Sequence, residues 1–350
     1  MLLLSKPSFA SCVYDRIDYI INKRKFDNQM KKILVLHTGG TISMQADNSG
    51  RVVPNQDNPM TKIHAAAQDI QLTVSDFLNL PSPHITPHHM LSIYHHIQER
   101  TDVFDGIVIT HGTDTLEETA YFLDTMALPT NIPVVLTGAM RSSNEVGSDG
   151  IYNYLTALRV ASSDKAKEKG VLVVMNDEIH AAKYVTKTHT TNISTFQTPT
   201  HGPLGIIMKN DLLFFKTAEP RIRFDLRCIS GTIPIIKAYA GMGDGSILSL
   251  LTPGSIQGLV IEALGAGNVP PLAVGEIEHL ITLGIPVVLV SRCFNGMAEP
   301  VYAYEGGGAM LQEAGVMFVK ELNAPKARLK LLIALNAGLT GQELKDYIEG

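Results

Sequence analysis

The sequence has 350 residues, which is long for a single hydrophobic core and predicts two domains. Hydrophobic residues account for 45% and charged residues for 18% of the chain, a balance that excludes a disordered protein. The formal net charge of −5 argues against nucleic acid as a partner. No uninterrupted apolar stretch approaches the roughly 20 residues of a membrane span, so no membrane association is expected.

Residues 1–29 are expected to form an N-terminal extension outside the folded core. The apolar run Met1–Leu4 has no basic segment before it, and Lys6 and Pro7 cut it short of a secretion signal. The folded core is predicted to begin at Met30. The cysteines are odd in number and widely spaced, which is typical of free thiols in a reducing cytoplasm; they are Cys12, Cys228 and Cys293.

From Met30 onward, short β-branched runs alternate with longer amphipathic segments, which predicts an α/β architecture. Most of these runs are continuously apolar, as in a parallel sheet covered on both faces. The predicted strands are Ile33–His37, Gly106–Thr110, Pro133–Thr137, Val171–Met175, Gly258–Glu262, Pro286–Ser291 and Val316–Val319.

Two helices and one domain boundary are predicted from local signals. A helix begins at Leu116, after Thr115 and Glu118 at the spacing of a capping box. A second helix covers Lys326–Leu339. The charge-rich stretch 217–231, which contains Pro220, is predicted to link a domain over 30–216 to a smaller one over 232–350.

Two threonine-containing motifs follow the first two predicted strands, His37–Ser43 and Thr110–Thr115. Because ligands bind at the carboxyl ends of parallel strands, we expect the hydroxyls of Thr41 and Thr113 in one crevice, with Asp114 beside them. Threonine is a covalent nucleophile where a neighbouring group activates it and donors stabilise the developing charge. The pattern therefore indicates an enzyme.

Each motif alone has a simpler interpretation. The pair Gly39–Gly40 also fits a plain turn after a strand, and Asp114 also fits a helix cap. Neither glycine-rich nucleotide signature occurs at the first motif, so nucleotide binding has little support. Lys187, in the run Val185–Thr188, would by itself be an ordinary surface lysine.

Together, these segments match one family. The matching motifs are Thr38–Ile42, His111–Thr115, Thr137–Arg141, Asp177 and Glu178 before Val185–Thr188, and the loop Gly265–Asn268. They resemble the bacterial L-asparaginases of the asparaginase/glutaminase family, specifically the cytoplasmic Gram-positive type. The resemblance covers residues 30–350. It implies a larger N-terminal parallel-sheet α/β domain with flavodoxin-like winding, followed by a smaller C-terminal α/β domain.

The resemblance also implies an activity, the hydrolysis of L-asparagine to L-aspartate and ammonia through a threonine-linked β-aspartyl acyl-enzyme. Thr41 would attack the side-chain amide, and Thr113, Asp114 and Lys187 would relay the proton or orient the water. No metal or organic cofactor is needed for this chemistry. Chemistry alone does not decide between Thr41 and Thr113 as the attacking group.

Substrate binding is likewise implied by the resemblance. Ser82 would bind the α-carboxylate, and Asp114 would accept from the α-ammonium. Main-chain N–H groups around Thr113 and Ala139 would stabilise the oxyanion, each worth on the order of 10²–10³ in rate. Gly40 is the remaining residue expected to contact the substrate.

Two departures from the family pattern bear on specificity. The predicted lid, Met44–Pro59, has no tyrosine, although many family members carry one there. Pro83 and Ala266 stand where members of broader specificity often have glutamine and asparagine. With fewer polar groups around the α-amino group, glutaminase activity is expected to be weak.

Two other functions remain open, and assembly is also implied. An amino-acid or nucleotide binding protein on the same fold would not need Thr41, Thr113, Asp114 and Lys187 together. An amidotransferase subunit acting on transfer RNA normally carries an added domain, for which this length leaves no room.

By the resemblance we expect a homotetramer, with a dimer as second choice, in which Gly265–Asn268 and Tyr302–Glu305 reach a neighbouring subunit.

Three further features are not interpreted as sites. His84 and His88 have the spacing of a zinc pair, but Pro87 interrupts the helix that they would need, so a half-exposed, histidine-rich helix is predicted. His111 is expected to pack or to bond to backbone. Cys293 has no histidine nearby and is predicted to be a buried structural thiol.

Overall fold

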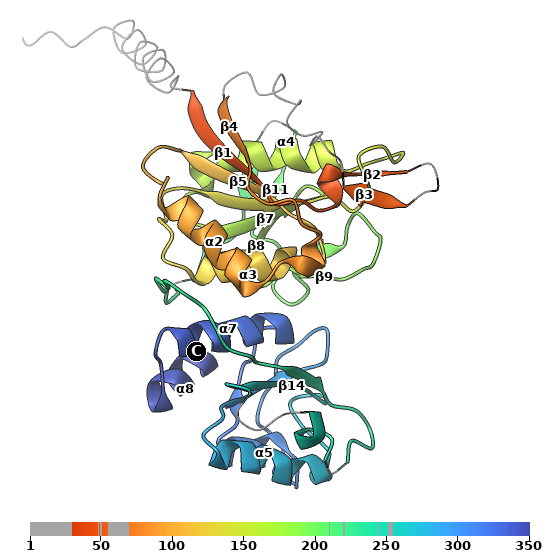
Figure 1. Ribbon diagram of the computed structural model, residues 1–350, viewed down its shortest axis with the longest axis vertical. Helices are drawn as coiled ribbons and strands as arrows, with labels where there is room; N and C mark the ends of the chain where they lie inside the picture. Colours follow the sequence, from red (N-terminus) through yellow and green to blue (C-terminus); the bar gives the residue numbers. More distant parts are fainter. Residues whose placement is uncertain are drawn as a thin grey trace, which may run out of the picture.

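The computed structural model describes residues 30–47, 49, 51–54, 70–209, 211–219, 221–243, 245–250 and 255–350. The expected N-terminal extension, residues 1–29, and residues 48, 50 and 55–59 of the expected lid lie outside this part. Within it, an eight-stranded sheet and a four-stranded sheet form the frames of two α/β units, stacked one above the other in Figure 1. The chain passes once from the larger unit to the smaller.

The larger sheet is built around five parallel strands. In spatial order these are β4 (Ile70–Asp76), β1 (Lys31–His37), β5 (Gly106–Thr110), β6 (Val134–Thr137) and β7 (Val171–Met175). Numbered along the chain, the order is second, first, third, fourth, fifth, which is the flavodoxin-like winding that was expected. The direction of winding therefore reverses between β1 and β5, the place where ligands bind in open sheets of this kind.

Three short antiparallel strands extend this sheet beyond β7, so it is mixed rather than purely parallel. They are β8 (Glu178–Ala181), β11 (Gly205–Ile207) and β12 (Leu212–Phe214). The chain reverses directly after β7 because Asn176 and Asp177 have φ of 49° and 65°, the left-handed backbone of a two-residue hairpin. Strand β8, which was not predicted from the sequence, therefore lies between β7 and the run that contains Lys187.

Helices cover both faces of the large sheet, which explains the continuously apolar strands. Helices α2 (Pro87–Gln98) and α3 (Leu116–Thr125) lie on one face, and α4 (Gly150–Ala161) lies on the other (Figure 1). Along β5, Ile107 and Ile109 belong to the core under α2 and α3, whereas Val108 belongs to the core under α4.

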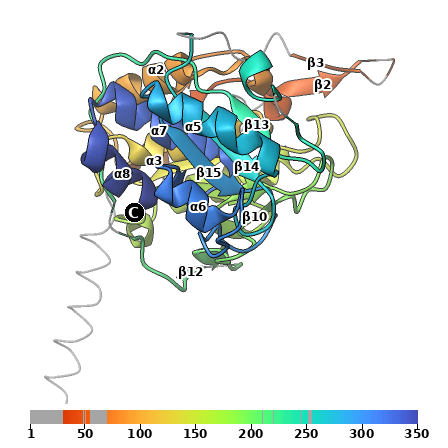
Figure 2. The same cartoon turned by 90° about the horizontal axis from the view of Figure 1, so that it is seen from below.

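The smaller sheet is parallel throughout, in the order β13 (Ile235–Lys237), β14 (Leu259–Ala263), β15 (Val287–Ser291) and β16 (Met317–Phe318). Helix α7 (Ala324–Asn336) lies between this sheet and the large unit (Figure 1), and its leucines share one core with α3 and β14. Figure 2 shows the unit from below, with α5 (Val274–Thr282) near the viewer.

The remaining described elements are short. They are η1 (Thr41–Ser43), β2 (Met44–Ala46), β3 (Val52–Pro54), η4 (Ser82–His84), η5 (Asp164–Ala166), β9 (Thr186–Lys187), β10 (Phe196–Gln197), η6 (Leu248–Leu250), η7 (Pro271–Ala273), α6 (Gly308–Glu313) and α8 (Gly341–Glu349).

All seven predicted strands are present, the first predicted helix begins at Leu116 as expected, and the second is present with shifted ends. Helix α7 begins at Ala324 and ends at Asn336, and a separate helix, α8, follows it. The predicted capping box is wrong, because the Thr115 hydroxyl donates to the carbonyl of Ser82 at 2.7 Å instead of capping α3. Cys293 is also corrected, since it lies exposed in the loop after β15.

Substituting Gly40 tests the backbone contact between the two threonine loops. A Cβ at Gly40 would lie 2.2 Å from the Cα of Gly112, and Gly40 has φ of +85°. Gly40→Ala should therefore lower the free energy of unfolding by more than about 3 kcal/mol in urea titrations. Gly284→Ala is the control, because φ is +76° but nothing lies within 4 Å, so only about 1 kcal/mol is expected. Equal losses in the two variants would contradict this.

Candidate active site

Both threonine motifs lie at the carboxyl edge of the large sheet, where β1 and β5 are neighbours. The two strands run parallel with His37 paired to Thr110. The next residue, Thr38, donates both its N–H and its hydroxyl to the carbonyl of Thr110, at 3.1 Å and 2.8 Å. The two loops therefore leave the sheet side by side at the winding reversal.

Glycines bring the two loops into direct backbone contact. Gly39 and Gly40 both have positive φ, and Gly40 packs against the backbone of Gly112. Thr41 follows as the first residue of η1, where the N–H of Ser43 donates to the carbonyl of Gly40 at 2.9 Å. A side chain at position 40 would push the two loops apart, which explains why the sequence has glycine there.

Lys187 joins the second motif from a distant part of the chain. Its Nζ donates to Thr113 Oγ1 at 3.0 Å and to Asp114 Oδ1 at 2.6 Å. The side chain of Lys187 is 17% exposed, whereas that of Asp114 is 59% exposed. The structure therefore brings these three predicted residues together, and the carboxylate remains accessible to a ligand.

Ser82 lies against the same motif. It is buried, its Oγ accepts the N–H of Asp114 at 3.2 Å, and a Cβ on Gly112 would lie 2.7 Å from that Oγ. A serine hydroxyl can accept one hydrogen bond and donate another. The O–H of Ser82 is thus available to donate to a carboxylate beside Asp114.

The loop after β6 forms a further part of the site. A Cβ on Gly138 would lie 3.3 Å from Thr113 Cγ2, and one on Gly150 would lie 3.2 Å from Ile42 and 3.3 Å from Ala139. The two loop residues Gly138 and Ala139 therefore lie near Thr113 and near Ile42, the residue after Thr41. None of the hydrogen bonds in the described ranges uses the N–H of Ala139, which fits the expected oxyanion donor.

Two residues that sequence reasoning missed hold this loop. The Asp149 carboxylate accepts the N–H of Met140 and of Arg141 at 3.1 Å and 3.0 Å. Asn153 Nδ2 donates to the carbonyl of Gly138 at 3.1 Å. Both lie at the start of α4, so the amino end of that helix fixes the loop that carries Ala139.

His111 supports the second motif without facing solvent. Its Nδ1 donates to the carbonyl of Gly112 at 2.8 Å, so its Nε2 accepts the hydroxyl of Thr119 at 2.9 Å. Burial lowers the pKa of His111 to about 4, and the ring is neutral near pH 7. As expected, this histidine bonds to backbone.

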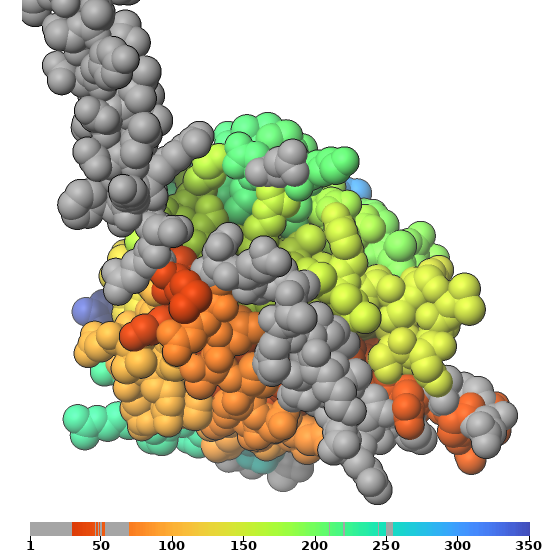
Figure 3. Space-filling view, turned by 90° about the horizontal axis from the view of Figure 1, so that it is seen from above, coloured from red at the N-terminus to blue at the C-terminus, as the bar shows by residue number. Residues whose placement is uncertain are grey.

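The segment after Thr41 continues into the β2–β3 hairpin, which protrudes at the edge of the face seen in Figure 3. Ser143, in the loop before α4, holds the first strand of this hairpin. Its N–H and hydroxyl both donate to the carbonyl of Met44, at 3.1 Å and 2.9 Å. The described part of the expected lid is thus attached to the loop that carries Ala139.

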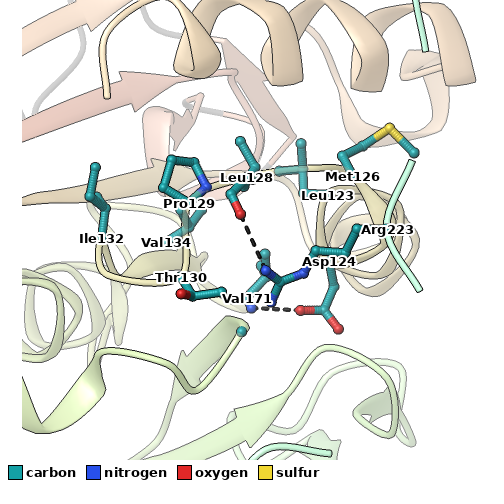
Figure 4. A pocket seen from close by; sticks show the side chains of 11 residues that line it. Leu123, Asp124, Met126, Leu128, Pro129, Thr130, Ile132, Val134, Val171 and Arg223 are labelled. Carbon is teal, nitrogen blue, oxygen red and sulfur yellow. Dashed lines mark hydrogen bonds between the residues drawn. The ribbon is translucent and has the colours of Figure 1, made fainter. Parts of the chain in front are cut away.

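The hollow in Figure 4 lies at the other edge of the sheet, beside Val134 and Val171, which begin β6 and β7. Its volume is only about 10 Å³, and two of its polar groups bond to the surrounding backbone. Asp124 accepts the N–H of Val171 at 2.7 Å, and Arg223 donates to the carbonyl of Leu128 at 3.3 Å. At about 10 Å³ this hollow is too small to hold an amino acid.

Two other expectations are a half-exposed helix rich in histidine and the absence of a membrane-spanning segment. Helix α2 is half-exposed and rich in histidine, as predicted, and no group of three or more His, Cys, Asp or Glu within the described ranges could hold a metal ion. In the same part of the chain, no helix is long and apolar enough to cross a bilayer.

A doubly wound α/β unit with two threonine loops, a lysine and a carboxylate at its winding reversal defines an amidohydrolase type of site. Comparison with known families agrees. "Asparaginase, N-terminal" matches residues 32–220, and "Glutaminase/Asparaginase C-terminal domain" matches residues 232–348. The chain belongs to the asparaginase family, and it is an amidohydrolase.

Individual relatives are similar over nearly their whole length. A "Probable L-asparaginase" of Deinococcus radiodurans is 40% identical over 90% of this chain and 96% of its own. An "L-asparaginase" of Bacillus licheniformis is 34% identical, covering 87% and 95%. The solved structure of a "Probable Cytoplasmic L-asparaginase" from Campylobacter jejuni is 29% identical with a TM-score of 0.80, covering 91% of this chain and 99% of that one.

Proposed function

We propose that this enzyme hydrolyses L-asparagine to L-aspartate and ammonia, with Thr41 as the nucleophile. The observation that carries the proposal is the ammonium of Lys187 between Thr113 and Asp114, on a loop in backbone contact with the turn before Thr41. The names of the relatives from Deinococcus radiodurans and Bacillus licheniformis support asparagine as the substrate.

In the first half of the reaction, Thr41 Oγ1 bonds to the side-chain amide carbon of asparagine. The hydroxyl proton of Thr41 passes to the amide nitrogen, the C–N bond breaks, and ammonia leaves. A β-aspartyl ester then remains on Thr41. The N–H of Ala139 donates to the oxyanion that develops during the attack, in a position where no internal acceptor within the described ranges competes for it.

In the second half, water attacks the ester carbon, its proton returns to Thr41 Oγ1, and aspartate is released. Because Thr113 Oγ1 accepts from Lys187, its own hydrogen is directed elsewhere and orients the water. The Ser82 hydroxyl donates to the α-carboxylate. The exposed carboxylate of Asp114 accepts from the α-ammonium, and Gly40 allows the substrate to approach the backbone.

Removing the hydroxyl of Thr41 should abolish the reaction. Thr41→Ala should release ammonia from asparagine at least about 10³-fold more slowly than the intact enzyme, because no ester can form. Thr41→Ser should retain measurable turnover. Thr101→Ala, which removes a hydroxyl that bonds to the carbonyl of Gln98 at the end of α2, should be fully active. Full activity of Thr41→Ala would contradict the proposal.

Asparagine should be strongly preferred to glutamine. Pro83 is exposed beside Ser82, and Ala266 is half-buried with its carbonyl accepting from Glu299, so neither adds a polar side chain near the α-amino group. A relative from Pseudomonas fluorescens named "Glutaminase-asparaginase" is 28% identical. Here kcat/KM for glutamine should be lower by about 10–200-fold, the range for one methylene. Comparable turnover of both amides would refute this preference.

The active form is proposed to be a homotetramer, or failing that a dimer, in the cytoplasm. The similarity to the "Probable Cytoplasmic L-asparaginase" from Campylobacter jejuni supports the location. Tyr302 and Tyr304 are 47% and 54% exposed and lie 5.5 Å apart, ring to ring, which is typical of an interface rather than a free surface. Light scattering should report the tetramer, and a fully active monomer would contradict it.

A further inference from the structure

The run of residues before Lys187 is held by the smaller unit. Four residues, Lys183–Thr186, precede this lysine and leave strand β8 to reach it. The smaller unit contributes one short segment to this contact, Glu321–Lys326, which runs from the loop after β16 into the first turn of α7. Two distant segments therefore meet behind the predicted catalytic cluster.

Lys326 is the centre of this contact. Its side chain is 2% exposed, and its Nζ donates to the carbonyl of Val185 and, at 3.2 Å, to that of Lys183. The same Nζ lies 3.7 Å from the carboxylate of Glu117. Glu117 is in the first turn of α3, three residues after Asp114. One buried ammonium thus joins the backbone before Lys187 to the helix after Asp114.

Asn323 repeats the same bridge with a neutral side chain. Its Nδ2 lies 3.3 Å from Glu117 Oε2 and 3.3 Å from Thr186 Oγ1. Its Oδ1 accepts the N–H of Lys326 at 3.2 Å and so caps α7. One side-chain amide therefore caps α7 with its oxygen and contacts Glu117 and Thr186 with its nitrogen. The three contacts together fix the orientation of the Asn323 side chain.

Glu321 holds the outer end of the run together with Glu219, which lies outside the smaller unit. Glu219 accepts from Lys183 at 3.0 Å and from Tyr184 at 2.6 Å. The Oε2 of Glu321 accepts from Lys183 Nζ at 2.7 Å and from the Tyr184 hydroxyl at 3.2 Å. The side chains of Lys183 and Glu321 are about one-third exposed, so their ion pair contributes less stability than the buried ammonium does.

Burial lowers the pKa of Lys326 to about 8, so this side chain is mostly charged at neutral pH. If the Lys183–Thr186 run moved away, the buried ammonium of Lys326 would lose the carbonyls that accept from it. The free-energy cost of an unpaired buried charge therefore disfavours other conformations of this run.

We propose that Lys326 and Asn323 are positioning residues for the reaction: they hold the Lys183–Thr186 run against Glu117, so that Lys187 meets Thr113 and Asp114. The inference rests on the proposed function, because it assigns to the smaller unit the placement of a catalytic lysine. Neither residue contacts the substrate. Both act on the segments on either side of the 2.6 Å contact between Lys187 and Asp114, Lys326 through backbone carbonyls and Asn323 through side chains.

Kinetics of two variants test this proposal. Lys326→Met keeps the apolar stem and removes the ammonium. Asn323→Asp keeps the oxygen that caps α7 but removes the Nδ2 donor and faces Glu117 with a second carboxylate. Both should lower kcat for asparagine by at least about tenfold, with KM within about threefold, since the groups expected to bind the substrate are unchanged.

Leu332→Ala is the matched control. Leu332 is buried in the same helix and belongs to the core that α7 shares with α3, so its truncation loosens the packing without touching the network. At a temperature well below its unfolding, kcat should equal that of the intact enzyme. If Leu332→Ala lost as much kcat as Lys326→Met, or if Lys326→Met kept full kcat, positioning would be refuted.

Amide hydrogen exchange separates this proposal from the proposed function. In Lys326→Met, the peptide covering residues 183–188 should exchange at least about tenfold faster, and the peptide covering β5 should be unchanged. This readout does not depend on turnover. An intact enzyme without asparaginase activity would overturn the function alone, whereas unchanged exchange at residues 183–188 would overturn the positioning role.

Discussion

The contact between the backbones of Gly40 and Gly112 is the constraint on which the site depends. It joins the loops that follow β1 and β5, so that Thr41 and Thr113 lie on adjacent segments at the point where the winding of the sheet reverses. The distance between two neighbouring strands cannot change, and the loops can approach only where neither carries a side chain. The close approach of the two loops therefore depends on glycine, which has no Cβ, at both positions.

A second constraint is electrostatic, and it connects the two α/β units. Lys187 brings a cation to Asp114 from a two-residue strand that has little core of its own. The buried ammonium of Lys326 and the amide of Asn323 hold the preceding backbone to α3. The smaller unit thus contributes side chains that hold the run before Lys187, while the larger unit holds the lysine's own strand by pairing it with β10.

The sequence predicts the parallel frame well, because strands covered on both faces are continuously apolar, as Ile107–Ile109 are. It misses β4, an edge strand on which half-buried and exposed residues alternate. It also misses the antiparallel edge, since Asn176 and Asp177 turn the chain without glycine. Within the site, short motifs predict Thr41, Thr113 and Asp114. Glu117 and Lys326 lie 209 positions apart in the sequence, and no local pattern indicates their contact.

The central claim is that Thr41, and not Thr113, carries the acyl group. The most direct measurement is to mix enzyme with asparagine, quench with acid during turnover, digest the protein, and locate the β-aspartyl ester by mass spectrometry. We predict the modification on the peptide that contains Thr41, with the Thr113 peptide unmodified. An ester found on Thr113, with Thr41 unmodified, would contradict the claim.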